Sequence, residues 1–235
     1  MSGPTVAIMQ PTYLPYLGYF ELIALCDVFV LLDDVQFQRR SWQSRNRILT
    51  VTGELMLSVP VRSHPRETPI AAIELAEDQS WRDTHLSSIH HAYAGRPGVK
   101  DALSLMGAEL GGGATRLADL TSSIIATTAR RIGLPTRFVR ATSLGCGARR
   151  SDHLVEICRR LEASAYLSTG GSRAYIEADA AFTGAGLEVR YHEHAPAAYP
   201  QAGGAAFTPY MSFVDALANT GWAGLSDLVR AVERP

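Results

Sequence analysis

The sequence contains only three cysteines, and no two of them are close together: Cys26, Cys146 and Cys158. It has no Cys-x-x-Cys pair and no histidine and cysteine grouping with zinc spacing, so neither a metal site nor a disulfide framework is expected. Free thiols fit a reducing compartment. No oriented base is visible beside Cys146, and the helical position of Cys158 is typical of a core residue, so cysteine catalysis is not expected.

Long apolar runs and an excess of one charge are also missing. No stretch approaches the ~20 apolar residues of a membrane span, and residues 1–4 lack the basic and apolar regions of a signal peptide. Lys and Arg number 22 against 23 Asp and Glu, a formal net charge of -1, which predicts no broad nucleic-acid footprint. We therefore expect a cytoplasmic protein that binds neither membranes nor nucleic acids.

What the sequence does have is enough apolar material for a core, with 46% hydrophobic residues in 235. Residues 5–9 and 28–32 read as short buried strands on either side of a helix at 19–26. This strand–helix–strand unit predicts a parallel sheet. With no repeat or linker visible, we expect a single Rossmann-like α/β domain over residues 1–235, with a helical insertion at about 78–131.

The remaining elements follow from turn residues and apolar spacing. Residues 52–54 form a hairpin turn between strands at 48–51 and 55–61. A third strand-like run covers 69–75. The glycines at 111–113 divide a helical region that runs from 99 to 131. Further helices are predicted at 81–93, 152–162 and 213–219, with strands at 137–141, 165–168 and 186–191.

The loop after the first strand is the strongest candidate for a binding site. It would lie at the carboxyl edge of the sheet, where open α/β folds bind ligands, and it leads into a helix N-terminus that suits an anion. The alternative is that its prolines only stiffen the turn and its tyrosines only pack. The residues of interest are Gln10, Tyr13, Tyr16, Gly18 and Tyr19.

Two polar segments follow the second strand. Asp33 and Asp34, with Gln36 close behind, would bind a substrate amine, position a metal or supply a base, unless they only cap a loop. The next segment is rich in arginine and suits a phosphate or carboxylate, although a solvated basic face has a similar composition. Its residues of interest are Arg40, Trp42, Asn46 and Arg47.

Later in the chain, His85 and Tyr93 lie eight residues apart on a predicted helix and share one side. His85 is either a general base or a structural histidine. Gly170 and Gly171 form a turn between a strand and a helix that could cradle an anion. Gln201 belongs to a Tyr-Pro-Gln segment that is either a lid or a packed loop.

The first loop resembles the nucleotide-binding turn of the HIGH-type nucleotidyltransferases, in which His-x-Gly-His opens the first helix. Here Tyr16 and Tyr19 stand in place of the two histidines. Tyrosine brings no positive charge to a transferring phosphoryl group, so the resemblance implies the fold and leaves both loss and retention of nucleotidyl transfer open.

A resemblance to the WbqC-like family covers almost the whole chain. These are bacterial proteins often encoded with polysaccharide or natural-product pathways, and the family implies no single activity. The neighbouring pathways suggest acyl or aminoacyl transfer to an amine. The matching segments are 7–23, 33–49 and 59–61, the helix with Trp81, His85, Ile89 and Tyr93, then 166–171 with Tyr175, 199–201 and 207–215.

The leading hypothesis is a transferase that takes an acyl or aminoacyl group from a phosphate-bearing donor, a nucleotide or a coenzyme A or pantetheine thioester. Asp34 or His85 would deprotonate the acceptor amine, and tyrosine hydroxyls, that of Tyr19 among them, or helix N–H groups would stabilise the oxyanion. The partners would be a small-molecule substrate and an acyl or peptidyl carrier protein. The alternatives are an ATP-dependent ligase or nucleotidyltransferase, and a non-catalytic module that binds a sugar nucleotide or a carrier protein.

Overall fold

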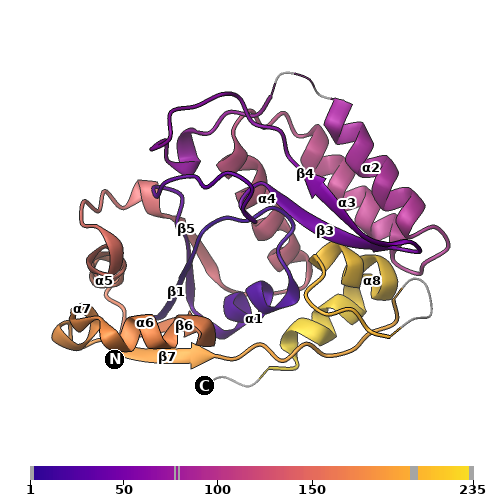
Figure 1. The fold of residues 1–235 in the computed structure, drawn as a ribbon. Coiled ribbons are helices and arrows are strands. Elements are labelled where there is room, and N and C mark those ends of the chain that lie inside the picture. The colour runs from indigo at the N-terminus through magenta and orange to yellow at the C-terminus, as the bar shows by residue number, and fades with distance from the viewer. Residues whose placement is uncertain (1–2, 77, 79, 202–205, 233–235) are drawn as a thin grey trace.

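Five parallel strands form the central sheet, in the order β5-β2-β1-β6-β7 (Figure 1). The computed structural model describes residues 3–76, 78, 80–201 and 206–232. From the central β1 the chain builds outward in both directions, which is a Rossmann-like order. The predicted α/β class is confirmed, as is the parallel pairing of the first two strands. The strands are β1 (Thr5–Met9), β2 (Val28–Leu31), β5 (Arg137–Arg140), β6 (Ala165–Thr169) and β7 (Glu188–His192).

The two faces of the sheet are covered by different helices, because successive side chains of a strand point to opposite faces. Val6 and Val28 belong to one core, whereas their neighbours Ala7 and Phe29 belong to another. Figure 1 shows the sheet between the two groups of helices. The first core packs against α5 (Arg150–Arg160), α6 (Arg173–Ala178) and α7 (Ala180–Gly184), and the second against α1 (Leu17–Leu25), α4 (Leu117–Arg131) and α8 (Phe213–Arg230).

The segment between β2 and β5 contains an antiparallel hairpin, as predicted, followed by helices. The hairpin begins at Arg45, three residues earlier than expected, so that Arg45, Asn46 and Arg47 are strand residues. The other elements of the chain are β3 (Arg45–Thr50), β4 (Gly53–Ser58), η1 (Ile70–Ala72), α2 (Ser80–Ala92), α3 (Val99–Gly111), η2 (Ala141–Ser143) and η3 (Gly170–Ser172).

The strand predicted at 69–75 is wrong. A short 3₁₀ helix, η1, occupies its centre, and Leu75 makes only an isolated bridge to Val61. Ile70 and Ile73 are both fully buried, and side chains three residues apart fall on one side of a 3₁₀ turn. The backbone N–H of Ile70 donates to Val35 O at 2.9 Å, so this segment is tied to the loop that follows β2.

The longest helix, α8, has 18 residues and bends at Gly221, whose φ is 70°. Gly98, just before α3, packs against this bend, and its N–H donates to Ala218 O at 2.9 Å. A Cβ on Gly98 would lie 2.0 Å from Leu217 O and 2.6 Å from Gly221 N. Within the described part of the chain, no helix has the length and apolar character needed to cross a membrane.

We expect Gly98→Ala to lower the free energy of unfolding by about 1–3 kcal/mol, because an overpacked site forces the backbone to move. The measurement is chemical denaturation followed by circular dichroism. Gly107→Ala inside α3 is the matched control, since a Cβ there meets nothing within 4 Å. It should stabilise the protein by about 0.5–1 kcal/mol. Equal effects of the two substitutions would contradict the close approach of α3 to α8.

Candidate functional site

The topology of the sheet sets the position of the candidate site. The strand order reverses between β1 and β6, and in open α/β folds ligands bind at the carboxyl end of the strands at such a point. The loop at 10–16 follows β1, and the turn at Gly170 and Gly171 follows β6. Both predicted binding loops therefore lie at the carboxyl edge.

The first loop is held by the β3–β4 hairpin. The Asn46 side-chain amide donates to the carbonyl oxygens of Tyr13 and Leu14, at 3.1 and 2.7 Å. Leu14 has a φ of 49°, unusual for a residue with a side chain, and the N–H of Tyr13 donates to Trp42 O at 2.9 Å. Asn46 is buried. Asn46 therefore fixes the shape of the loop, and both hydrogen bonds donated by its side-chain amide are made to protein atoms.

A cavity of ≈ 370 Å³ lies between this loop and the hairpin. Four of its nine lining residues are aromatic, including Trp42, one guanidinium comes from Arg47, and Met9 at the end of β1 also lines it. The cavity is the size of a small-ligand pocket and lies where the fold predicts one. Its lining residues are Met9, Thr12, Pro15, Tyr16, Tyr19, Trp42, Asn46, Arg47 and Tyr210.

A larger hollow of ≈ 640 Å³ lies elsewhere, between the hairpin turn and α2. It is open to solvent and is lined mostly by short polar side chains such as Thr84, Ser87 and Ser88. Because it is remote from the carboxyl ends of the strands, we place the candidate site in the smaller cavity.

Arg47 is positioned by a carboxylate and an indole. Its Nη1 lies 2.9 Å from Glu54 Oε2, and its guanidinium lies 5.9 Å from the centre of the Trp42 ring. The Arg47 side chain is 26% exposed, whereas Trp42 is half exposed. The pair can hold a planar or anionic group at the cavity.

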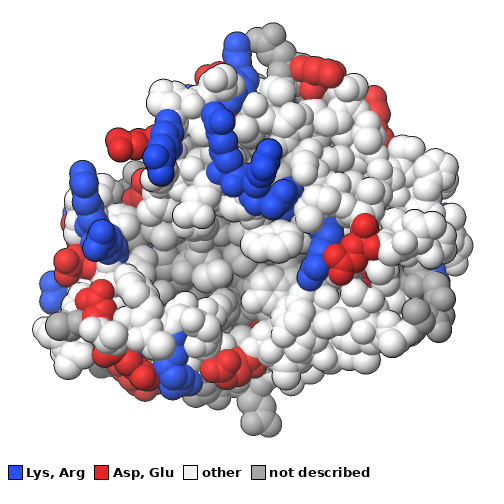
Figure 2. All heavy atoms as spheres, in the orientation of Figure 1, with Lys and Arg blue, Asp and Glu red and all other residues white. Residues whose placement is uncertain are grey.

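Arg40 lies outside this cavity. It lines a neighbouring hollow of ≈ 430 Å³ together with Arg39, Arg62 and His64. A third hollow of ≈ 480 Å³ adds Gln36 and Arg66, and the Gln36 side chain donates to Arg66 O at 2.8 Å. Figure 2 shows Lys and Arg gathered above the recess at the centre of this face. The arginine-rich segment thus divides between the cavity and an adjoining basic surface.

The two aspartates after β2 have different surroundings. Asp33 is fully buried and is bound by Arg140 Nε at 2.5 Å and by the Thr142 N–H at 3.0 Å, so it ties β2 to the end of β5. Asp34 is partly exposed, with its Oδ2 3.0 Å from His153 Nε2 on α5. Its other carboxylate oxygen is buried and has no hydrogen-bond partner among the described residues. Of the two aspartates, only Asp34 has a partly exposed side chain.

His85 is buried, and its Nδ1 lies 2.8 Å from the hydroxyl of Tyr13. Burial lowers the pKa of His85 to about 4, against the opposing effect of a backbone hydrogen bond with Ser58. Its ring is therefore neutral at pH 7, and its Nδ1 shares a hydrogen bond with the hydroxyl of Tyr13. His85 and Tyr13 form an internal pair that is not part of the cavity lining.

Tyr93 and Gln201 meet at a buried carboxylate that the sequence analysis did not single out. Asp215 accepts hydrogen bonds from the hydroxyls of Tyr93 and Tyr199, both at 2.7 Å, and from Gln201 Nε2 at 2.9 Å. Burial raises the pKa of Asp215, which these hydrogen bonds only partly offset. The Tyr-Pro-Gln segment is thus fastened to α8.

Two other predicted residues bind the backbone or a neighbouring side chain. The Tyr19 hydroxyl, although its ring lines the cavity, donates to Gln10 O at 3.0 Å, and the Gln10 side chain accepts from Gln43 Nε2 at 2.8 Å.

In the turn after β6, a Cβ on Gly170 would lie 1.9 Å from the Glu193 carboxylate, whereas Gly171 has open space around it. A side chain at position 170 would therefore displace the carboxylate of Glu193, which ends an exposed side chain.

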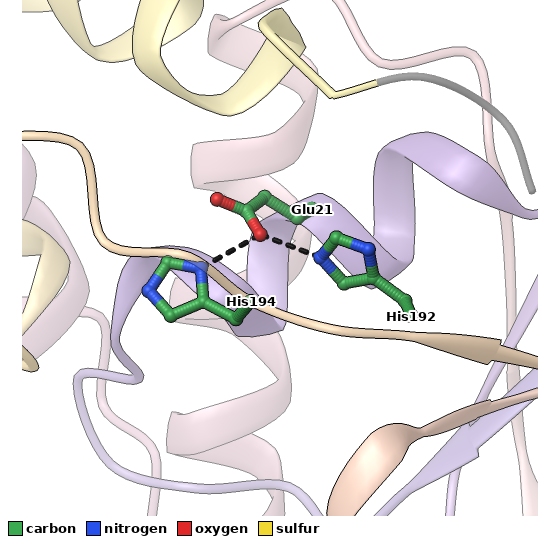
Figure 3. Close-up of side chains that lie close together, drawn as sticks. All are labelled: Glu21, His192 and His194. Atoms are coloured by element: carbon green, nitrogen blue, oxygen red, sulfur yellow. Dashed lines mark hydrogen bonds and ion pairs between the residues drawn. The ribbon is translucent and has the colours of Figure 1, made fainter.

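One cluster has no counterpart in the sequence predictions. Glu21 on α1 is buried, and its Oε2 lies 2.6 Å from His192 Nε2 and 2.7 Å from His194 Nδ1 (Figure 3). Burial opposes the ionisation of Glu21, but hydrogen bonds from the two histidines outweigh it and lower the pKa. The His-x-His spacing was the available clue, because residues i and i+2 of a strand share a side. Glu21 itself lies in an apolar helix sequence.

A family model places this chain among known proteins. The model of the WbqC-like protein family matches residues 10–227, and the chain belongs to that family. The uncharacterized protein Rv1507c of Mycobacterium tuberculosis is 28% identical over 218 residues, which cover 92% of this chain and 94% of that protein. No solved structure matches the chain with statistical significance.

The burial of His85 predicts a pH dependence of stability. Its pKa falls from 6.5 to about 4 on folding, so the unfolded chain binds the proton more tightly. The free energy of unfolding is therefore unaffected by His85 above about pH 6.5 and decreases as the pH falls toward 4. The total decrease is at most about 3 kcal/mol. The measurement is urea denaturation of the wild type and of His85→Gln between pH 7.5 and 4.5.

The difference between these two proteins should shrink as the pH falls, because only the wild type has to protonate this ring. The matched control is His91→Gln, a substitution on the exposed face of the same helix. A constant difference between wild type and His85→Gln across this range would show that His85 is not held neutral by burial.

Proposed function

We propose that this protein is a transferase of a polysaccharide or natural-product pathway. It would move an acyl or aminoacyl group from a phosphate-bearing donor to an amine. The donor is a pantetheine thioester or a nucleotide-activated acyl group. The observation that carries the proposal is the cavity at the carboxyl end of β1, where Tyr16, Trp42, Arg47 and Tyr210 surround one space.

This lining matches the two parts of such a donor. Aromatic rings accept a base or an apolar arm, and the fork of Arg47 can bind a phosphate through two hydrogen bonds. Burial, together with the charges of Glu21 and Tyr210, raises the pKa of Tyr16. The Tyr16 hydroxyl therefore remains a hydrogen-bond donor at neutral pH.

The adjoining basic surface supports the binding of an extended anionic donor. Arg39, Arg40 and Arg66 line hollows next to one another on this surface. Arg40 has a φ of 58°, a backbone strain of the kind found at binding sites. A donor with its reactive end in the cavity would extend its phosphates toward these side chains, and an acidic carrier protein would bind the same surface.

Asp34 is the base that the geometry supports best. It follows β2, the neighbour of β1, and its carboxylate is 20% exposed and is held by His153 Nε2 through Oδ2. His85 is unsuited to this role because its Nδ1 already shares a hydrogen bond with the hydroxyl of Tyr13. This role requires the acceptor amine to bind between Asp34 and the cavity, because a general base must lie within hydrogen-bond reach of the proton that it removes.

In the proposed reaction the amine nitrogen attacks the carbonyl carbon of the donor and forms a C–N bond. The C–S or C–O bond to the donor then breaks, and the thiolate or phosphate leaves with the electron pair. Asp34 takes the proton that the amine loses. The Tyr16 hydroxyl would stabilise the oxyanion, since the hydroxyl of Tyr19, the residue predicted for that role, already donates to Gln10 O.

A binding module without chemistry is the second candidate, and the same hydrogen bonds favour it. Three side chains predicted to be catalytic, those of Tyr19, Asp34 and His85, each already have a partner within the protein. Native mass spectrometry of the purified protein, before and after addition of an amine, separates the two functions. A transferase would pass the acyl group to the amine and release the amide and the deacylated donor, whereas a binding module would retain the intact acyl donor.

We expect Arg47→Lys to weaken donor binding about tenfold or more, because lysine keeps the charge but loses the two-pronged contact, each such bond contributing roughly 1.5–3 kcal/mol. The measurement is calorimetric titration with nucleotides and coenzyme A thioesters. Arg131→Lys is the matched control, since Arg131 also lies over a tryptophan, Trp222, at 5.1 Å. Unchanged affinity in Arg47→Lys with an intact fold would refute this role for Arg47.

A further inference from the structure

Three potential metal ligands converge from two segments that are far apart in the sequence. Glu21 comes from α1, whereas His192 ends β7 and His194 follows two residues later. One oxygen or nitrogen atom from each residue lies within 4.8 Å of the other two. All three side chains are at most 10% exposed. The arrangement is therefore an enclosed triad, unlike the exposed acidic clusters that are common on protein surfaces.

Glu21 needs a compensating group, because a buried carboxylate is costly when nothing offsets its charge. The partners of its Oε2 are His192 Nε2 and His194 Nδ1, and among the described residues no Lys or Arg forms an ion pair with it. A divalent ion between the three side chains would supply the compensating charge.

The triad is rigidly supported, as a metal site requires. A Cβ on Gly18 would lie 2.7 Å from Cγ and 2.9 Å from Cβ of His194, so only glycine lets this imidazole pack against the first turn of α1. The ring of His194 also packs edge-on against Tyr16 at 5.2 Å and Tyr210 at 5.7 Å. Both tyrosines line the cavity, so the triad lies one side chain away from it.

We propose that Glu21, His192 and His194 bind one divalent transition-metal ion of the zinc, cobalt or iron(II) type beside the cavity. Two imidazole nitrogens and one carboxylate suit these metals and disfavour magnesium and calcium, which prefer oxygen ligands. Three protein ligands leave at least one coordination position for water or for a group of the substrate. The proposal is independent of the transferase activity, since it rests on the triad alone.

The test is metal titration of the full-length protein, prepared without a histidine tag and freed of metal with a chelator. Zn²⁺ and Co²⁺ are titrated by calorimetry, the Co²⁺ complex is also followed by visible absorption, and Mg²⁺ serves as the control ion. We expect one Zn²⁺ or Co²⁺ per chain, a rise in melting temperature on binding, and no comparable binding of Mg²⁺. The absence of stoichiometric binding by the wild type would overturn the proposal and leave the triad as a hydrogen-bonded cluster.

The variants are Glu21→Gln and His194→Ala. Each substitution replaces one of the three proposed ligands. Loss of a residue that only hydrogen-bonds to a metal ligand weakens metal binding roughly 10–100-fold, so each variant should weaken Zn²⁺ and Co²⁺ binding by at least this factor. The double variant His90→Ala/His91→Ala is the matched control, because it removes two exposed histidines from α2 and leaves the triad intact. Equal loss of binding in this control would overturn the proposal.

Circular dichroism establishes whether each variant folds. If neither variant folds, X-ray absorption of the Co²⁺-loaded wild type decides, because the proposed site gives a signature of two imidazoles. A Co²⁺ ion that shows only oxygen ligands would reject the triad as the binding site.

Discussion

The two hydrogen bonds from the Asn46 amide to the carbonyls of Tyr13 and Leu14 determine the shape of the candidate site. They join the loop after β1 to a hairpin outside the central sheet, and the cavity is the space between these two segments. A buried carbonyl without a partner costs about 1–3 kcal/mol. The left-handed turn at Leu14 is therefore stable only while Asn46 satisfies these carbonyls, and the positions of Tyr16 and Arg47 depend on it.

Buried polar contacts tie the other long segments to the sheet in a similar way. Asp33 joins β2 to Arg140, and Asp215 joins α8 to the segment at 199–201. Glu21 joins α1 to the last residue of β7 and to the segment after it. Because a polar group in a low-dielectric interior must be paired, each contact permits one arrangement of its segments and disfavours others. The cavity is enclosed on several sides by segments positioned through such pairs.

Several features could be predicted from the sequence. The apolar runs at 5–9 and 28–32 with a helix between them predicted the parallel sheet, because that spacing leaves few other topologies. The position of the first loop at the carboxyl edge followed from the same pattern. The run at 69–75 was read as a strand because an apolar run of this length has no distinct period. Its 3₁₀ turn is determined by hydrogen bonds to the loop after β2.

For the site, the sequence by itself determined which residue types were available near the first strand, including the tyrosines, the two aspartates and the arginines. Only the tertiary structure decided their surroundings. It buried Asp33 and His85 against partners 107 and 72 residues away, and it separated Arg40 from Arg47. It also brought Glu21 to His192 across 171 residues. The physical reason is that periodicity predicts the face of an element on which a side chain lies, whereas its partner depends on the packing of other elements.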